Sequence, residues 1–196
     1  MSAYDAMRPA GPPTVIIGLG ITGYSCLRHL AGRRPLTVLD TRDTPPNEAA
    51  ARAGYPDVTF RFGAESASFT FDGVAEVIVS PGIGLDHCLV QRALAAGARV
   101  QSDIDLFFEV VQAAGGAPIH AVTGTNGKST VTALVGHLLH ALGHNPGVGG
   151  NLGEPALDLL DTPRDCYVLE LSSFQLERMR AQRFAAATIL NVTEDH

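Results

Sequence analysis

The sequence is poor in three features that would each indicate a particular class of protein. It has only three cysteines among 196 residues, Cys26, Cys88 and Cys166, and their wide spacing suggests neither a disulfide framework nor a thiolate metal site. Its net charge is −6 and its basic residues form no runs, which argues against binding to nucleic acid. It also lacks an apolar run long enough to span a bilayer. We therefore expect a cytoplasmic protein with reduced thiols and neither a membrane nor a nucleic-acid partner.

The chain has enough apolar residues, 45% of the total, to form a hydrophobic core in one large domain or two small ones. Apolar segments typical of buried strands alternate with segments of helical spacing, which predicts an α/β fold with parallel sheets covered on both faces. The expected strands lie at 14–17, 36–39, 58–62, 74–79, 98–101, 118–122, 167–171 and 185–190, and the expected helices at 24–31, 87–96, 104–113 and 131–142. We expect a flexible leader at 1–13 instead of a signal peptide, a Rossmann-like domain at 14–114, a linker at 115–117 and a phosphate-loop domain at 118–196.

The most informative segment is a glycine-rich turn between the strand at 118–122 and the helix at 131–142. Its candidate ATP-binding residues are Gly124, Thr125, Asn126, Gly127, Lys128, Ser129 and Thr130. Unpaired amides at a helix N-terminus favour an anion, and glycines let the backbone approach phosphate oxygens. Lys128 would supply a positive charge and Ser129 a hydroxyl for Mg²⁺. Only two residues separate the first glycine from the Gly-Lys pair, where the usual phosphate loop has four, so a polar turn without function is the alternative.

A second glycine-rich turn, at 18–23, follows the strand at 14–17 and precedes a helix. Its G-x-G-x-x-G spacing, with Asp40 about 20 residues after the first glycine, is typical of dinucleotide-binding folds, where the acid bonds the ribose. We favour a nucleotide-binding role, although the motif alone is weak evidence for NAD. A turn that only packs the helix against the strand is the alternative.

Other polar residues follow predicted strands, and parallel strands end on one edge of their sheet. Glu170 lies near the end of an apolar strand, where a lone carboxylate needs a partner; a divalent cation beside ATP phosphates is favoured over a salt bridge. We expect Lys128, Glu170 and His196 to converge at this edge. The turn at 80–82 is equally consistent with ligand binding and with a plain turn.

Two features have less specific interpretations. Arg42 is either a ligand for phosphate or a solvated loop arginine, and the latter is the more common case. His137, His140 and His144 share one helical face, which we interpret as a solvated face and not as a metal site, because no carboxylate is interleaved.

Seven segments, in this order, resemble the Mur ligases, the ATP-dependent amide-bond ligases of peptidoglycan precursor synthesis. They are Gly18–Gly23, Asp40–Arg42, Ser80–Ile83, Thr123–Thr130, Gly147–Asn151, Leu169–Glu177 and Asn191–His196. The resemblance extends from Val15 to His196, and the short gap in the phosphate loop is itself the Mur pattern. The Ser-Ser-Phe-Gln-Leu-Glu stretch at 172–177 favours the member that adds D-glutamate.

This resemblance implies that the Rossmann-like domain holds the uridine diphosphate of a muramoyl substrate and not NAD. The implied substrate-binding residues are Ile21, Thr22, Asp40, Thr41, Arg42, Ser80, Pro81, Gly82, Gly150, Asn151, Ser172 and Gln175. The implied Mg²⁺ ligands are Ser129, Glu170 and His196. The implied catalytic residues are Lys128, Asp195 and His196.

The resemblance also implies a reaction in two steps. The carboxylate of UDP-N-acetylmuramoyl-L-alanine attacks the γ-phosphate of ATP, and the amine of D-glutamate then attacks the resulting acyl phosphate. Mur ligases have a larger central domain and a third domain, so we expect a Rossmann-like parallel-sheet N-terminal domain followed by an incomplete P-loop-type α/β central domain. We expect such a fragment to be a monomer without full catalytic competence. An NAD(P)-binding oxidoreductase and a non-catalytic nucleotide-binding module are the alternatives.

Overall fold

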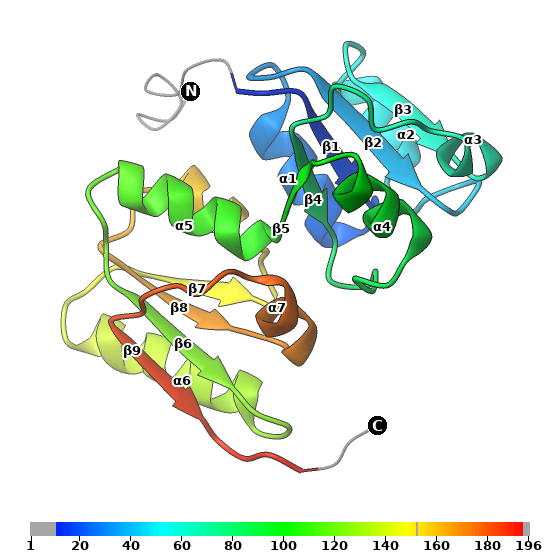
Figure 1. Ribbon diagram of the computed structural model, residues 1–196. Coiled ribbons are helices and arrows are strands. Elements are labelled where there is room, and N and C mark those ends of the chain that lie inside the picture. The colour runs from blue at the N-terminus through cyan, green and yellow to red at the C-terminus, as the bar shows by residue number, and fades with distance from the viewer. Residues whose placement is uncertain (1–10, 152, 194–196) are drawn as a thin grey trace. The chain divides into compact units, whose positions relative to one another are not determined.

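The computed structural model describes residues 11–151 and 153–193, and their contacts divide the chain into two compact units (Figure 1). One unit ends at Asp103 and the other begins at Ile104. Of the leader expected at 1–13, only residues 11–13 are described. In the described part of the chain, no helix combines the length and the apolar composition that crossing a bilayer would require.

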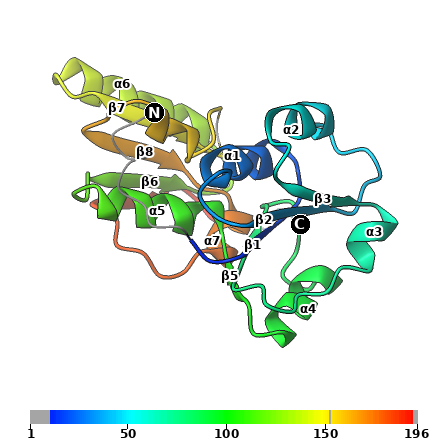
Figure 2. The same ribbon diagram turned by 90° about the horizontal axis from the view of Figure 1, so that it is seen from above.

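The first unit is a parallel sheet with the strand order β3-β2-β1-β4-β5. Its elements are β1 (Thr14–Ile17), α1 (Ile21–Leu30), β2 (Leu36–Asp40), α2 (Glu48–Gly54), β3 (Thr59–Phe62), α3 (Ala64–Ala67), β4 (Glu76–Val79), α4 (Cys88–Ala95) and β5 (Arg99–Gln101). Figure 2 shows α1 and α2 on one face of the sheet and α3 and α4 on the other. Because both faces are covered, every residue of β1 and β4 is buried.

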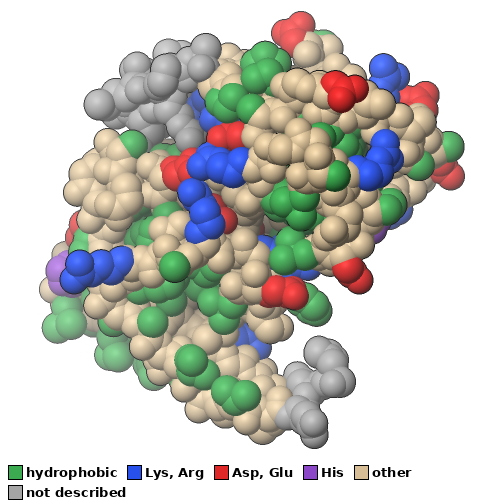
Figure 3. Space-filling model, in the orientation of Figure 1, with side chains coloured by type: hydrophobic (Ala, Val, Ile, Leu, Met, Phe, Trp, Pro, Cys, Tyr) green, Lys and Arg blue, Asp and Glu red, His purple; other side chains and the backbone are tan. Residues whose placement is uncertain are grey.

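The second unit is a parallel sheet with the order β7-β8-β6-β9. Its elements are α5 (Asp103–Ala113), β6 (Ile119–Thr123), α6 (Lys128–Ala141), β7 (Pro146–Gly150), the 3₁₀ helix η2 (Asp158–Asp161), β8 (Cys166–Glu170), α7 (Ser173–Arg178) and β9 (Ala186–Ile189). Figure 2 shows α5 and α6 on opposite faces of this sheet. Hydrophobic side chains reach the surface over α6 and β9, as Figure 3 shows, and they include Leu134, Leu138, Leu142 and Ile189.

Helix α5 packs within the second unit, so the division by contacts precedes the linker expected at 115–117. The Phe107 ring meets the Tyr167 ring of β8 edge to face, with the centroids 5.0 Å apart. On the same helix, the buried Asp105 carboxylate accepts hydrogen bonds from the Arg180 amide (2.9 Å) and the Gln182 side chain (3.0 Å). The spacing of apolar residues predicts this helix but does not show which sheet it covers.

The α/β fold and all of the expected strands and helices are confirmed, within a few residues at their ends. The sequence patterns did not indicate α2, α3, β7, η2 and α7. Strand β7 is glycine-rich, a composition that disfavours strands. The glycines are nevertheless required, because neighbouring residues leave no room for side chains at these positions. A Cβ at Gly147 would lie 2.8 Å from the Tyr167 ring, and one at Gly149 would lie 2.3 Å from the Glu154 carbonyl oxygen. Tertiary packing therefore explains both the strand and its composition.

Candidate functional site

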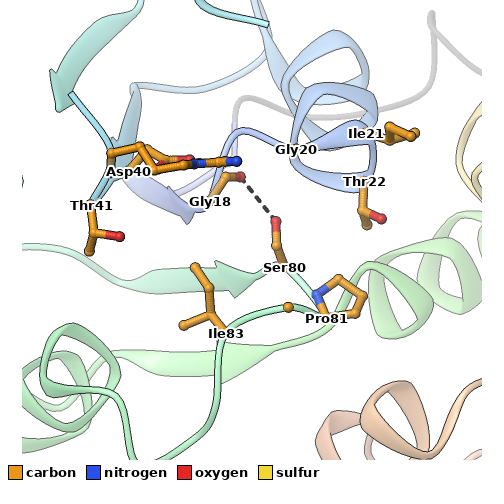
Figure 4. A pocket seen from close by; sticks show the side chains of 11 residues that line it. Gly18, Gly20, Ile21, Thr22, Asp40, Thr41, Ser80, Pro81 and Ile83 are labelled. Carbon is orange, nitrogen blue, oxygen red and sulfur yellow. Dashed lines mark hydrogen bonds and ion pairs between the residues drawn. The ribbon is translucent and has the colours of Figure 1, made fainter. Parts of the chain in front are cut away.

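A cavity of about 380 Å³ lies at the carboxyl ends of β1, β2 and β4 in the first unit (Figure 4). The strand order reverses between β1 and β4, so the loops that follow these two strands part and leave a crevice, the usual ligand position in such sheets. The cavity is lined by Gly18, Gly20, Ile21, Thr22, Asp40, Thr41, Arg42, Ser80, Pro81, Gly82 and Ile83. Every first-unit residue that the sequence implied for substrate binding is in this set.

The glycine turn that forms one wall of the cavity is required by packing. Gly18 has a φ of 97°, a conformation that side chains rarely adopt. A Cβ at Gly23, in the first turn of α1, would lie 1.8 Å from the Gly18 carbonyl oxygen. The Ser80 hydroxyl donates to the same oxygen (3.0 Å), which joins the loop after β4 to the loop after β1 (Figure 4).

Asp40, at the end of β2, is buried and fully engaged with its own protein. Its carboxylate accepts a hydrogen bond from the Leu19 amide (2.7 Å) and two from the Arg42 guanidinium (2.9 and 2.7 Å). Burial alone would raise the pKa of Asp40, but the bonds from Arg42 and Leu19 hold it below its ordinary value. Asp40 therefore fixes the glycine turn and orients Arg42, whose side chain is half exposed at the cavity.

The phosphate loop joins β6 to α6 in the second unit. Gly127 precedes the helix in a left-handed conformation, with a φ of 83°, and no side chain caps the helix. Amides of the first turn are therefore free of a capping side chain. The Lys128 ammonium donates to the carbonyl oxygens of Gly124 (2.7 Å) and Thr125 (2.9 Å), and so lies folded over the loop.

The carboxylate of Glu170 lies beside this loop, at the end of β8. Glu170 is buried, and one of its oxygens accepts from the Ser129 hydroxyl at 2.8 Å. The other accepts from the Asn151 side-chain amide, also at 2.8 Å. Parallel pairing of β8 with β6 and β7 brings these three residues together. The convergence predicted at this edge was that of Lys128, Glu170 and His196, and His196 lies outside the described residues. Gly150 has a φ of 102°, and a Cβ there would lie 2.5 Å from the Glu170 carbonyl oxygen.

Asn191 is a residue to which the sequence patterns gave no specific role. Its side chain accepts from the Asn126 amide (2.8 Å) and donates to the Asn126 carbonyl oxygen (2.9 Å), so it holds the tip of the phosphate loop. Next to it, the Thr193 amide donates to the Thr125 hydroxyl (3.1 Å). Only the pairing of β9 with β6 places these residues at the loop.

Comparison with known families accounts for both units. Residues 13–102 match the family described as Mur ligase MurD-like, N-terminal domain, and residues 122–196 match the Mur ligase middle domain. The UDP-N-acetylmuramoylalanine--D-glutamate ligase of Marinobacter nauticus is 50% identical over 184 residues, and that of Pseudomonas aeruginosa is 48% identical over 183 residues. This chain belongs to the Mur ligase family. Family members are ATP-dependent ligases.

The match covers 93% of this Mur ligase chain but only about 40% of the length of each of these two relatives. Solved structures support the fold. A UDP-N-acetylmuramate:L-alanyl-gamma-D-glutamyl-meso-diaminopimelate ligase from Neisseria meningitides has a TM-score of 0.55 at 20% identity, with 95% of this chain and 62% of that one covered. A UDP-N-acetylmuramate-alanine ligase from Thermotoga maritima has a TM-score of 0.53 at 22% identity, with coverages of 95% and 43%.

Two of the implied substrate-binding residues of this Mur ligase have a structural role at α7. The Ser172 hydroxyl accepts from the Gln175 amide (3.2 Å), and the Gln175 side-chain oxygen accepts from the Ser172 amide (3.1 Å). This reciprocal capping box begins the helix, and Gln175 is 98% buried. Asp195 and His196, two of the three implied catalytic residues, lie outside the described residues.

Proposed function

We propose that this chain supplies the UDP-substrate unit and the first part of the ATP-binding unit of a ligase that joins D-glutamate to UDP-N-acetylmuramoyl-L-alanine. The observation that carries the proposal is the phosphate loop with Glu170 beside it, in a chain about half identical to ligases of that name. The reaction is the two-step transfer through an acyl phosphate, which gives the carboxylate a leaving group. We place the protein in the cytoplasm, as a monomer.

Ser129 and Glu170 fit a Mg²⁺ ion. Neighbouring oxygens in an octahedral Mg²⁺ shell with bonds of about 2.1 Å lie about 3.0 Å apart. The Ser129 hydroxyl and the Glu170 carboxylate oxygen are 2.8 Å apart, so both can bind one ion with little movement. His196 is the further ligand in this proposal. When bound, the ion would neutralise charge on the phosphate groups of ATP.

Lys128 would act on the phosphate groups directly. Its ammonium bonds two loop carbonyls, and rotation of this long side chain would bring it from those carbonyls to phosphate oxygens in front of the loop. The uncapped amides after Gly127 would bind phosphate as well. Positive charge and amides placed in advance stabilise the charge that develops on a transferred phosphoryl group.

The cavity of the first unit would hold the uridine diphosphate. Arg42 offers a cation, oriented by Asp40, and Thr22 and Thr41 offer hydroxyls at the rim. Gly150 and Asn151, in the second unit, are also proposed as substrate-binding residues. An NAD(P)-binding oxidoreductase has less support, because the Asp40 carboxylate that would bond a ribose is already occupied by Leu19 and Arg42.

Calorimetric titration tests the substrate assignment. UDP-N-acetylmuramoyl-L-alanine is expected to bind the chain, NADH is not, and Arg42→Ala is expected to weaken binding by about tenfold, the loss of one charge-assisted contact. Arg61→Ala is the matched control, because Arg61 is equally exposed at 51% and does not line the cavity. Binding of NADH alone would refute the assignment. Observed turnover of ATP with both substrates would exclude the alternative of a non-catalytic nucleotide-binding module.

A further inference from the structure

A second cluster of potential ligands lies in the second unit, away from the phosphate loop. His144, Asp165 and Cys166 each direct one ligand atom into a space where all three atoms lie within 4.8 Å of one another. His144 follows the C-terminal end of α6, and Cys166 begins β8. Glu170, beside the phosphate loop, ends the same five-residue strand, and at about 3.3 Å per residue the two ends of β8 are about 13 Å apart. The cluster therefore lies at the edge of the sheet opposite the phosphate loop (Figure 1).

The backbone places His144 through the way in which α6 ends. Gly143 takes a left-handed φ of 89°, and the His144 amide donates to the Leu139 carbonyl oxygen (3.0 Å). These features stop the helix and turn the chain toward β7, which pairs with β8. His144 thereby leaves the histidine face of α6, where His137 and His140 remain exposed.

The loop before β8 is fastened to the segment that carries His144. The Asn145 amide donates to both oxygens of the Asp165 carboxylate, each at 3.0 Å. The Asn145 side chain donates to the Pro163 carbonyl oxygen (2.9 Å) and accepts from the Arg164 guanidinium (2.9 Å). The Arg164 guanidinium is therefore bonded to the Asn145 side-chain oxygen. The Asp165 carboxylate can still bind a ligand on the side that faces His144.

The donor set and its spacing fit a transition-metal dication. We propose that His144, Asp165 and Cys166 form a binding site for a Zn²⁺-like ion, with a fourth position open to water. The His144 Nδ1 and the nearer Asp165 oxygen are 3.6 Å apart. Tetrahedral Zn²⁺ with N and O bonds of about 2.0–2.1 Å would place these atoms about 3.3–3.4 Å apart. Imidazole and thiolate ligands select such an ion over Mg²⁺ or Ca²⁺, which prefer oxygen.

The Cys166 thiol lies beside the carboxylate of Asp165. Burial and the neighbouring Asp165 carboxylate raise the pKa of Cys166 to about 11, whereas the Asn145 amide holds the pKa of Asp165 below its ordinary value. When the metal–sulfur bond forms, the thiol proton of Cys166 is released to solvent.

Cobalt substitution tests the site, because a cobalt–thiolate bond produces a near-ultraviolet charge-transfer band. The purified, chelator-treated chain is titrated with Co²⁺, and one equivalent is expected to produce the band, which Zn²⁺ should then abolish and Mg²⁺ should not. Cys166→Ser is expected to remove the band. His144→Ala, at a half-exposed position that leaves the core intact, is expected to weaken binding at least about tenfold.

Two variants serve as matched controls. Cys88→Ser removes the exposed thiol of the first unit, and His140→Ala removes an exposed histidine of α6; both should bind Co²⁺ as the wild type does. Zn²⁺ should also raise the unfolding temperature of the wild type but not that of His144→Ala. A band that survives Cys166→Ser, affinity unchanged in His144→Ala, or displacement by Mg²⁺ would each overturn the proposal.

Discussion

Replacing Gly23 with alanine should destabilise the first unit and distort its cavity. The new methyl group would lie 1.8 Å from the Gly18 carbonyl oxygen, whereas contacts below 3.0 Å are essentially never seen. Helix α1 would have to move by about 1.2 Å, and the obstacle is backbone, which cannot rotate away. Overpacking of this kind costs about 1–3 kcal/mol. A loss of about 2 kcal/mol corresponds to roughly 8–16 °C in the melting temperature of a domain of this size.

Gly20→Ala is the matched control within the same turn. Gly20 has a φ of −79°, and a Cβ there would have no neighbour within 4 Å. Alanine is a poorer N-cap residue than glycine, which lowers the free energy of unfolding, but it also makes the unfolded chain less flexible, which raises it. We therefore expect the free energy of unfolding to change by no more than about 1 kcal/mol. Peptide-resolved hydrogen exchange provides the assay, with β6 and α6 of the second unit as an internal reference. If both variants lose the same protection in β1 and α1, the packing argument is wrong.

Three further changes test individual contacts. Asp40→Asn should lower the free energy of unfolding by roughly 1–2 kcal/mol at pH 7, because it removes hydrogen bonds made to the charged Asp40 carboxylate. The loss stays this small because Arg42 is half exposed and solvent weakens its interaction with Asp40. The lowered pKa of Asp40 means that this stabilisation is present above the ordinary value of 3.8 and is lost as the pH falls through the lowered value. In urea unfolding, the difference between Asp40→Asn and the wild type should therefore be full at pH 7 and should narrow as the solution is acidified below pH 3.8. Glu170→Gln should reduce Mg²⁺-dependent binding of an ATP analogue at least about tenfold, whereas the exposed control Glu177→Gln should not; equal Mg²⁺ dependence would count against the proposed metal ligand. Asn191→Ala should lower the free energy of unfolding by about 1 kcal/mol and should speed hydrogen exchange of the Asn126 amide. An unchanged exchange rate would show that the Asn191 side chain does not hold the phosphate loop.

The phosphate loop, the turn at 18–23 and Glu170 could be predicted largely because they lie at strand ends. An apolar strand followed by glycines and a helix predicts the phosphate loop and the turn at 18–23, and parallel pairing then brings Ser129 and Glu170 to one edge. The same logic does not give side-chain partners. Asp40 was interpreted first as a ribose ligand, yet in the fold it bonds Leu19 and Arg42. Gln175 was implied as a substrate ligand by resemblance, yet it is buried in the cap of α7.

The cluster of His144, Asp165 and Cys166 is an instance of what spacing along the chain conceals. The histidines were interpreted as a helical face without an interleaved carboxylate, and the cysteines as isolated thiols. Both descriptions are true of the sequence, and yet β7–β8 pairing brings residues about twenty positions apart into one group. Because the turn at Gly143 stops α6, it is His144, and not His137 or His140, that joins this group.

The sequence by itself determined the α/β class, the order of the main strands and helices, and the two glycine turns, because these follow from local periodicity and from backbone conformations that only glycine adopts readily. Tertiary structure alone decided that α5 covers the second sheet, that glycine-rich β7 is a strand, that Asn191 fastens the phosphate loop, and that Asp40 is occupied. These outcomes depend on contacts between segments distant in the chain, whose energies exceed the local preferences of the residues involved.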